Sequence, residues 1–361
     1  MPFTKRPGAV LDSANPQLVL HYGSLFPEQR ALTRGGVVPR ADTAVLRLSG
    51  ADRLRWLDSI SSQQLLSLTP RESTESLILD PHGHVQWVLR LVDDGEALWA
   101  LTPVSHRDAV LTWLQSMRFR ADVHIVDVSA EYTVVSVVGS IAIAPDRFSA
   151  TVWRDPWPGV SPGGYGYASH ARDWHLHDWI VPNDQLVALD AALTEHSISV
   201  AGWLALTALR IAAGRPDALD IDDRSLPHEF DWLRTAVHLS KGCYRGQETV
   251  AKVHNLGRPP RRLVVLHLDG SDTLLPAVGD RIWAEREGEP RDVGDIRAVA
   301  VHWELGPIAL GLVKRAMPVT TALTVHVGTV PVAAQQEELV PSEAGPAVDL
   351  PRLRRSPRDA S

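Results

Sequence analysis

The last third of the chain carries the pattern that most constrains its fold. Five short apolar segments follow one another there, each separated from the next by glycine, proline or aspartate: Leu263–Leu268, Arg281–Ala284, Asp292–Val301, Ala309–Val313 and Leu323–Val327. Their lengths are those of strands, and the residues between them favour turns. Short strands at this spacing are typical of a small antiparallel barrel or sandwich, which we expect here.

The first part of the chain mixes both kinds of secondary structure. Val45–Leu48 alternates like a strand, whereas Ala51–Leu66 and Ser105–Met117 have the apolar spacing of helices. Between the two helices, Glu75–Leu101 has the pattern of antiparallel strands, with a turn at Asp80–Gly83. This segregation of strands and helices predicts an α+β fold.

A segment rich in tryptophan, proline and glycine covers residues 145–182. It contains Trp153, Trp157, Trp174 and Trp179. Frequent proline and glycine interrupt regular structure. We therefore expect an irregular segment that its indole rings fix to the body of the protein.

Length and composition limit the class of protein. A chain of 361 residues exceeds what one hydrophobic core organises, so we expect two or three domains. Its 44% apolar and 22% charged content is that of a soluble globular protein. The net charge of −7 argues against binding nucleic acid through bulk electrostatics, so direct nucleic-acid binding is not expected.

Cysteine content and apolar runs bear on the compartment. One cysteine excludes an intrachain disulfide framework and suits a reducing cytoplasm, where we expect the protein to act. Met1–Gln17 lacks the apolar core of a signal peptide. The longest apolar run, Val134–Ala144, is interrupted by polar residues and is too short to span a bilayer, so no membrane partner is expected.

The only cysteine lies in a polar, glycine-rich stretch. That mixture is too polar for a core strand and too rich in glycine for a stable helix, so we interpret it as a functional loop. The stretch comprises Lys241, Gly242, Cys243, Tyr244, Arg245, Gly246, Gln247 and Glu248. The neighbouring cations favour the thiolate, which could act as a nucleophile, a redox thiol or a soft-metal ligand. The alternative is a small buried apolar residue.

Other polar clusters give weaker indications. The histidines of the turn near residue 83 and of residues 170–177 match no ligand spacing, so no metal site is predicted. The acidic turn at residues 220–223 lacks the length of a calcium loop. Arg210 and Arg215 end a predicted helix, where they either complement the helix dipole or face an anionic ligand.

The cysteine stretch resembles the signature of the YgfZ family of folate-binding proteins. The match continues through Thr249–Lys252 and extends to Leu209–Pro216, Pro227–Glu229 and Gly306–Gly311. The resemblance covers roughly residues 40–335, and the cysteine motif is its most specific part.

The family is similar in fold to the T-protein, the aminomethyltransferase of the glycine cleavage system. The resemblance therefore implies a folate-binding region of two α+β subdomains, a C-terminal antiparallel β-barrel and a central tetrahydrofolate cavity. The expected boundaries are an N-terminal extension at 1–40, the folate-binding region at 41–258 with subdomains of about 41–130 and 131–258, the barrel at 259–340 and a disordered tail at 341–361.

The resemblance also implies a function. We expect a folate-binding accessory protein in iron–sulfur cluster assembly or repair, whose partners are iron–sulfur enzymes or assembly proteins. Cys243 would supply a reactive thiol or a transient cluster ligand beside the cavity. Arg210, Glu229 and Asp222 would contact tetrahydrofolate or a derivative. The alternatives are a folate-dependent aminomethyltransferase and a tRNA-modification factor.

Two departures from the family pattern bear on activity. T-protein-like enzymes carry their catalytic aspartate after the glycine of the first hairpin, whereas the segment here, Gly83–Trp87, holds no carboxylate. A neutral amide or indole is no general base, so we do not expect aminomethyl transfer. Folate-binding relatives often have glutamate at the position of Ala212. Here either Glu229 or Asp222 replaces it, or pterin binding is weaker.

Overall fold

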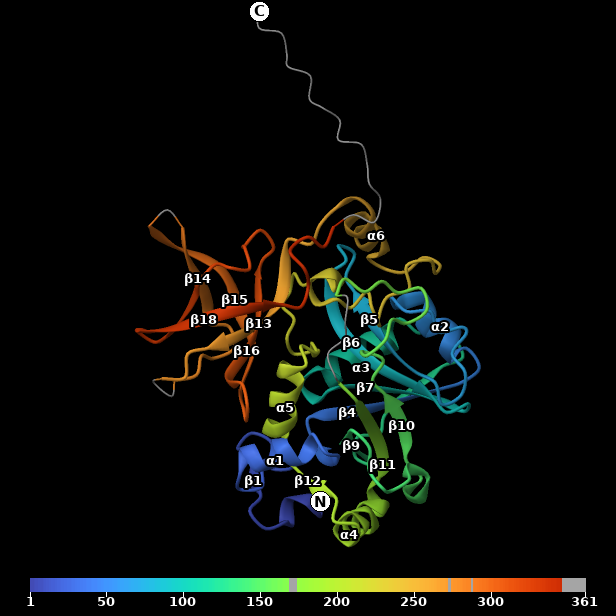
Figure 1. Cartoon of the computed structure of the whole chain (residues 1–361). Coiled ribbons are helices and arrows are strands. Elements are labelled where there is room, and N and C mark those ends of the chain that lie inside the picture. The colour runs from blue at the N-terminus through green and yellow to red at the C-terminus, as the bar shows by residue number, and fades with distance from the viewer. Residues whose placement is uncertain (169–173, 272–273, 287, 346–361) are drawn as a thin grey trace, which may run out of the picture.

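The computed structural model describes residues 1–168, 174–271, 274–286 and 288–345. Figure 1 shows a barrel to one side, two sheets with their helices to the other, and helix α5 between them. His170 and residues 346–361 of the expected tail lie outside the described residues. In the described part of the chain, no helix is both long and apolar enough to cross a membrane.

The first sheet has the strand order β5-β6-β7-β4-β8, and all its pairs are antiparallel. Its elements are β4 (Thr43–Ser49), α2 (Arg53–Ile60), β5 (Ser73–Leu79), β6 (Val85–Asp93), β7 (Ala97–Pro103), α3 (Arg107–Ser116) and β8 (His124–Asp127). The two helices bury apolar side chains against one face. The antiparallel strands expected within Glu75–Leu101 are confirmed, and the turn after Asp80 joins β5 to β6.

The second sheet has the order β10-β11-β9-β3-β12, and its β12–β3 pair is parallel. It contains β3 (Gly36–Arg40), β9 (Tyr132–Val138), β10 (Thr151–Arg154), β11 (Leu176–Pro182), α4 (Leu186–Glu195) and β12 (Ser199–Val200). The prediction of irregular structure over 145–182 is therefore wrong where β10 and β11 form. Polar His177 and Asp178 interrupt the apolar pattern of β11, which hid this strand.

The C-terminal part is a closed six-stranded barrel, so the barrel alternative of the sequence prediction is confirmed. Its strands are β13 (Arg261–Leu268), β14 (Arg281–Arg286), β15 (Glu289–His302), β16 (Gly306–Lys314), β17 (Leu323–Val327) and β18 (Val330–Glu338). Pairing of β18 with β13 closes the barrel. The sequence pattern missed β18, because its last four residues are the polar run Gln335, Gln336, Glu337 and Glu338.

Helix α5 (Trp203–Ala212) occupies the middle of the molecule. It packs against β15 and β16 of the barrel on one side and against α1 (Leu25–Leu32) on the other. Gly214 ends it with φ +66°, a left-handed conformation that favours glycine. The remaining N-terminal elements are η1 (Phe3–Lys5), β1 (Val10–Leu11) and β2 (Val19–His21).

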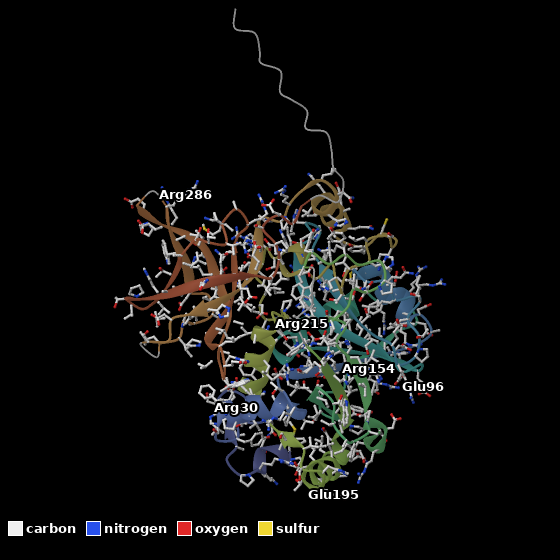
Figure 2. The ribbon with its side chains drawn as sticks, viewed as in Figure 1. Arg30, Glu96, Arg154, Glu195, Arg215 and Arg286 are labelled. Carbon is white, nitrogen blue, oxygen red and sulfur yellow. The ribbon has the colours of Figure 1, made fainter. Side chains whose placement is uncertain are left out.

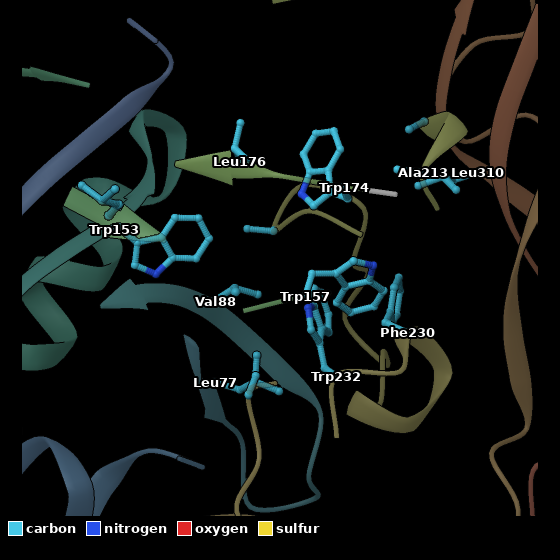
Figure 3. Close-up of a cluster of buried hydrophobic side chains, with 14 of the residues drawn as sticks. Leu77, Val88, Trp153, Trp157, Trp174, Leu176, Ala213, Phe230, Trp232 and Leu310 are labelled. Atoms are coloured by element: carbon cyan, nitrogen blue, oxygen red, sulfur yellow. The ribbon is translucent and has the colours of Figure 1, made fainter. Parts of the chain in front are cut away.

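A cluster of aromatic rings fills the space between the sheets and the barrel. Figure 3 shows Trp153, Trp157, Trp174, Phe230 and Trp232 in this core, and all five are buried. Phe230 and Trp232 stack with ring centroids 4.8 Å apart. The expectation that the tryptophans fix this part of the chain is thus confirmed, because buried aromatic rings contribute large apolar areas.

Arg261 is one of the residues that join the barrel to the rest of the protein. Arg261, the first residue of β13, binds Asp222 at 2.5 and 3.1 Å and Glu229 at 2.9 Å. Burial would raise the pKa of Asp222, but hydrogen bonds from Arg261 and Ser225 outweigh it and hold that pKa well below its usual range. This joint therefore depends on an ionised Asp222.

We predict that Asp222→Asn lowers the free energy of unfolding at pH 7 by about 1–3 kcal/mol, the range for hydrogen bonds to charged groups. Because the folded-state pKa is lowered, this stabilisation is complete above the unfolded pKa of about 4 and is lost as the pH falls further. The difference between variant and parent should thus shrink below pH 4 in urea unfolding. Asp223→Asn, whose side chain is 90% exposed, is the control. An unchanged difference at pH 2–3 would contradict the prediction.

Candidate functional site

A cavity of about 410 Å³, here the central cavity, lies where β6, α5, the loop after α5 and β15 meet. Its apolar wall comes from both sheets, α5 and the barrel: Val88, Leu101, Trp174, Leu176, Trp203, Leu206 and Ala298. Its polar wall holds five arginines and five carboxylates: Arg40, Arg90, Arg210, Arg215 and Arg297, with Asp42, Glu75, Asp155, Asp217 and Asp220. The first wall suits a flat ring, and the second suits a polar or charged ligand.

Arg215 connects the polar wall to two sheets, and Figure 2 shows it in the centre of the molecule. It binds Glu75 of β5 and, at 3.0 Å, Asp155 after β10. Glu75 also accepts a hydrogen bond from Thr235 at 2.8 Å, and the guanidinium lies 4.8 Å from the centre of the Trp157 ring. Burial would lower the pKa of Arg215, but the two carboxylates outweigh it and raise that pKa, so the residue stays charged.

Arg210 lies in the last turn of α5 and lines the central cavity. It donates to Asp220 at 2.7 and 3.3 Å and to the carbonyl oxygen of Arg215 at 2.9 Å. It therefore closes the loop between residues 215 and 220 onto the helix. A guanidinium has five donors, so three bonds leave capacity for an anionic ligand.

Asp217 and Asp42 are the carboxylates of the polar wall that a ligand can reach. Their side chains are 18% and 20% exposed, whereas the other three are at most 2% exposed. Asp217 accepts a hydrogen bond from Arg90 at 3.1 Å. Burial would raise its pKa, but Arg90, Arg210 and Arg40 outweigh it, so the pKa lies below its usual range and Asp217 is ionised.

Strand β6 supplies no carboxylate to the central cavity. It contributes Val88 and Arg90, whereas Gln86 is exposed. Arg90 is bound to Asp178 at 2.7 Å as well as to Asp217. The position that faces the cavity after the first hairpin turn is thus apolar.

The predicted folate contacts occupy different places. Arg210 lines the central cavity, whereas Glu229 and Asp222 are absent from its described lining and bind Arg261 instead. Ala212 lines a second cavity of about 350 Å³. Trp174 borders both cavities.

The lysine of the cysteine motif anchors the loop to the end of α2. Lys241 donates through Nζ to the carbonyl oxygens of Asp58, Ser61 and Gln63, the last two at 2.9 Å. Burial lowers the pKa of Lys241, although the Asp58 carboxylate opposes this shift. The ammonium group thus fixes the path of the loop. Cys243 itself is exposed.

Some of the other motif residues hold the loop in place, and the rest are exposed to solvent. Tyr244 is buried, and its ring lies 5.4 Å from the Lys241 ammonium. Gln247 donates to the carbonyl oxygen of Lys241 at 3.2 Å. The exposed members are Gly242, Cys243, Arg245 and Glu248. The thiol is therefore exposed next to Gly242, while the buried Tyr244 follows it in the chain.

Two glycines bring the cysteine loop against the turn between β5 and β6. Gly246 has φ +81°, and a Cβ there would lie 2.6 Å from the carbonyl oxygen of Asp80 and 2.9 Å from the Cα of Gly83. At Gly83, with φ +83°, a Cβ would lie 2.8 Å from the Cβ of Thr249. Only glycine fits these positions without displacement.

Cys243 is absent from the described lining of the central cavity. Strand β6 connects the two places. It begins at Val85, two residues after Gly83 of the turn that contacts the cysteine loop. It reaches the cavity at Val88, a rise of about 10 Å along the strand.

Metal ligands were not predicted from the sequence. Among the described residues, no three histidine, cysteine, aspartate or glutamate side chains are placed to hold a metal ion. His84 pairs with Asp80 at 3.0 Å, and His82 is exposed. His175 lines the second cavity.

Sequence reasoning missed most of the polar wall. Glu75, Arg90, Asp155 and Asp217 come from four separate stretches, and none belongs to a motif. Charged residues on strands that otherwise read as core, as at Glu75 and Arg90, were the available signal.

Comparison with known proteins gives low-identity relatives, and no protein-family model matches the chain. The chain is 26% identical over 255 residues to "Iron-sulfur cluster assembly factor IBA57 homolog, mitochondrial" from Mycosarcoma maydis, covering 64% of this chain and 57% of that protein. It is 24% identical over 278 residues to "tRNA-modifying protein YgfZ" from Colwellia psychrerythraea, covering 76% of this chain and 83% of that protein. The predicted resemblance to the YgfZ family is confirmed.

A solved structure supports the same conclusion for the fold. The glycine cleavage system aminomethyltransferase T from Bartonella henselae matches with a TM-score of 0.74 over 96% of this chain and 97% of that one. The sequences are 16% identical, so this likeness establishes the fold alone. The chain has the predicted T-protein-like α+β fold with a C-terminal barrel.

We predict that Gly246→Ala destabilises the protein by at least about 1 kcal/mol, because a left-handed residue gains a Cβ and that atom meets backbone. Gly242→Ala is the matched control, since a Cβ there meets nothing within 4 Å. The free energy of unfolding of the control, measured in urea, should lie within about 0.5 kcal/mol of that of the parent. Equal effects of the two substitutions would show that the loop does not pack on the hairpin turn.

Proposed function

We propose that this chain binds tetrahydrofolate or a derivative in the central cavity and assists iron–sulfur cluster assembly or repair. The observation that carries the proposal is this cavity of about 410 Å³, with one apolar and one charged wall, in a T-protein-like fold. Ligand sites of small aromatic molecules have this size and this division of surface.

The chemistry of the walls fits the parts of a folate. A pterin presents a flat ring and an edge of N–H donors, which require an apolar surface and an ionised acceptor. Trp203 and Leu206 offer the surface. Asp217 is an ionised carboxylate that a ligand can reach, whereas Asp42 is already bound by Arg40 and Trp203. The glutamate tail requires a cation, and Arg210 has donors left for it. Glu229 and Asp222 are committed to Arg261, so Asp217 is the better pterin acceptor.

The same walls favour binding over aminomethyl transfer. Transfer needs a base beside the reacting nitrogen, and β6 brings Val88 to the cavity. Asp217 is held ionised by three arginines, which makes it a poor proton acceptor at neutral pH.

Cys243 is proposed as the residue that acts on a partner. It is exposed on a loop whose path Lys241 fixes. One thiolate cannot hold an iron–sulfur cluster, which needs about four ligands. We therefore propose that Cys243 supplies one ligand or one exchangeable thiol, and that an iron–sulfur enzyme or assembly protein supplies the rest. The name of the Mycosarcoma relative, an iron–sulfur cluster assembly factor homolog, supports a role with such a partner.

A role in tRNA modification is the second candidate, favoured by the name that the Colwellia and Vibrio atlanticus relatives carry. The net charge of −7 favours an indirect role, through an iron–sulfur enzyme that modifies tRNA. Salt-dependent binding of tRNA to the purified protein would support a direct role instead.

We predict that tetrahydrofolate binds the purified protein and changes its tryptophan fluorescence, because Trp174 and Trp203 line the cavity. Arg210→Met should weaken binding by about 10-fold or more, since a charge-assisted hydrogen bond contributes about 1.5–3 kcal/mol. Arg224→Met, at a side chain 77% exposed, is the control. Thermal unfolding of both variants separates loss of binding from loss of fold. No fluorescence change at millimolar folate would refute the assignment.

We predict that Cys243→Ser fails to restore iron–sulfur enzyme activity in a deletion strain, while the parent chain restores it. Because the Cys243 side chain is exposed, the free energy of unfolding of the variant should lie within about 0.5 kcal/mol of that of the parent. Gly242→Ala serves as the control in the same loop. Full restoration by Cys243→Ser would remove the thiol from the mechanism.

A further inference from the structure

The second cavity, of about 350 Å³, lies between the last turn of α5 and the turn that joins β15 to β16. Trp174 and Ala212 belong to its apolar wall, and its polar wall includes the consecutive residues His302, Trp303 and Glu304. Among the described residues, its lining shares Trp174 alone with the central cavity. A volume at the lower end of the range for ligand sites suits a small ligand with one ring system.

Contacts within the protein fix the two tryptophans of this cavity. Gln29 of α1 donates to a carbonyl oxygen of β15 at 2.9 Å and accepts from the backbone N–H of Trp303 at 2.8 Å. The guanidinium of Arg30 lies 5.2 Å from the centre of the Trp303 ring. Trp174 donates through Nε1 to Asp155 at 2.8 Å. Aromatic walls that are fixed in this way favour a flat ligand.

The turn carries two ring N–H donors that are unpaired in the described part of the chain. Nδ1 of His302 accepts backbone hydrogen bonds from Glu304 and Leu305 at 3.3 and 3.2 Å, so the ring proton lies on Nε2. His302 is 7% exposed, and its Nε2 has no partner among the described residues. Nε1 of Trp303 is also buried without a partner. Because buried donors are nearly always satisfied, these adjacent groups favour a ligand with acceptor atoms.

The second cavity differs from the central cavity in charge. Glu304 is the only aspartate, glutamate, lysine or arginine of its described lining, whereas five arginines line the central cavity. A carboxylate accepts hydrogen bonds and repels anions. The described lining therefore favours an uncharged ligand, with N–H donors for Glu304 and acceptors for the two ring N–H groups.

We infer that the second cavity is a binding site for an uncharged guanine nucleoside. Guanine is flat, with the acceptors N7 and O6 at one edge and N–H donors at the next. The acceptors match the N–H groups of His302 and Trp303, and the donors match Glu304. Adenine carries an amino group in place of O6 and so presents a donor where an acceptor is required. A phosphate would add negative charge near Glu304, which favours the nucleoside over the nucleotide.

The test is a calorimetric titration of the full chain with guanosine. We expect saturable binding of one guanosine, with adenosine and guanosine 5′-monophosphate each bound about 10-fold more weakly or worse, because one group is mismatched in each. Glu304→Gln should weaken guanosine binding by about 10-fold or more. Glu195→Gln, at an exposed carboxylate outside the described lining, is the matched control. Absence of saturable binding, or equal affinity for guanosine and adenosine, would overturn the inference.

A second variant tests where guanosine binds, because the pterin ring of a folate carries acceptors and donors in the same order as guanine. Ala212 lines the second cavity but not the described part of the central cavity, and leucine is a good helix former. Ala212→Leu should therefore abolish guanosine binding by filling the second cavity, while thermal unfolding verifies the fold. Guanosine should also bind at saturating tetrahydrofolate. Displacement of guanosine by tetrahydrofolate, or guanosine binding that Ala212→Leu leaves unchanged, would overturn the inference.

Discussion

The central cavity depends on one buried cation. Arg215 binds Glu75 of the first sheet and Asp155 of the second, and it follows the helix that packs on the barrel. A buried charge is tolerated only when it is paired, and loss of one partner typically costs 3–5 kcal/mol, because the other charges stay buried. Arg215 thus ties the first sheet to the segment after β10, and the ring of Trp157 lies against its guanidinium.

Local patterns predicted much of the fold. Turn residues marked the barrel strands and the β5–β6 hairpin, because glycine, proline and aspartate act through their own backbone preferences. Strands β11 and β18 escaped, since Asp178 and Gln336 lie where an apolar residue would complete the alternation, and their partners come from distant segments. Ser136 donates a hydrogen bond to Asp178, and Arg262 donates one to Gln336. No local pattern reveals these partners.

The candidate site likewise has one part that local sequence reveals and another that it does not. The cysteine loop is contiguous, so its composition alone identified it. The polar wall of the cavity is assembled from residues far apart in the chain, and its ion pairs leave no periodicity. Nearness in sequence was also a poor guide to nearness in space. Glu229 and Asp222 lie close to the loop along the chain, yet both bind Arg261 at the barrel joint.

The contact between Gly83 and Gly246 has a consequence for how the cysteine loop can vary. Two backbones meet there with no side chain between them, and each glycine has a left-handed conformation. The two positions therefore form one mutational unit, in which a larger residue on either side displaces the other. A library that explores new chemistry around Cys243 can draw on the open positions Gly242 and Arg245, but it must leave this glycine pair unchanged.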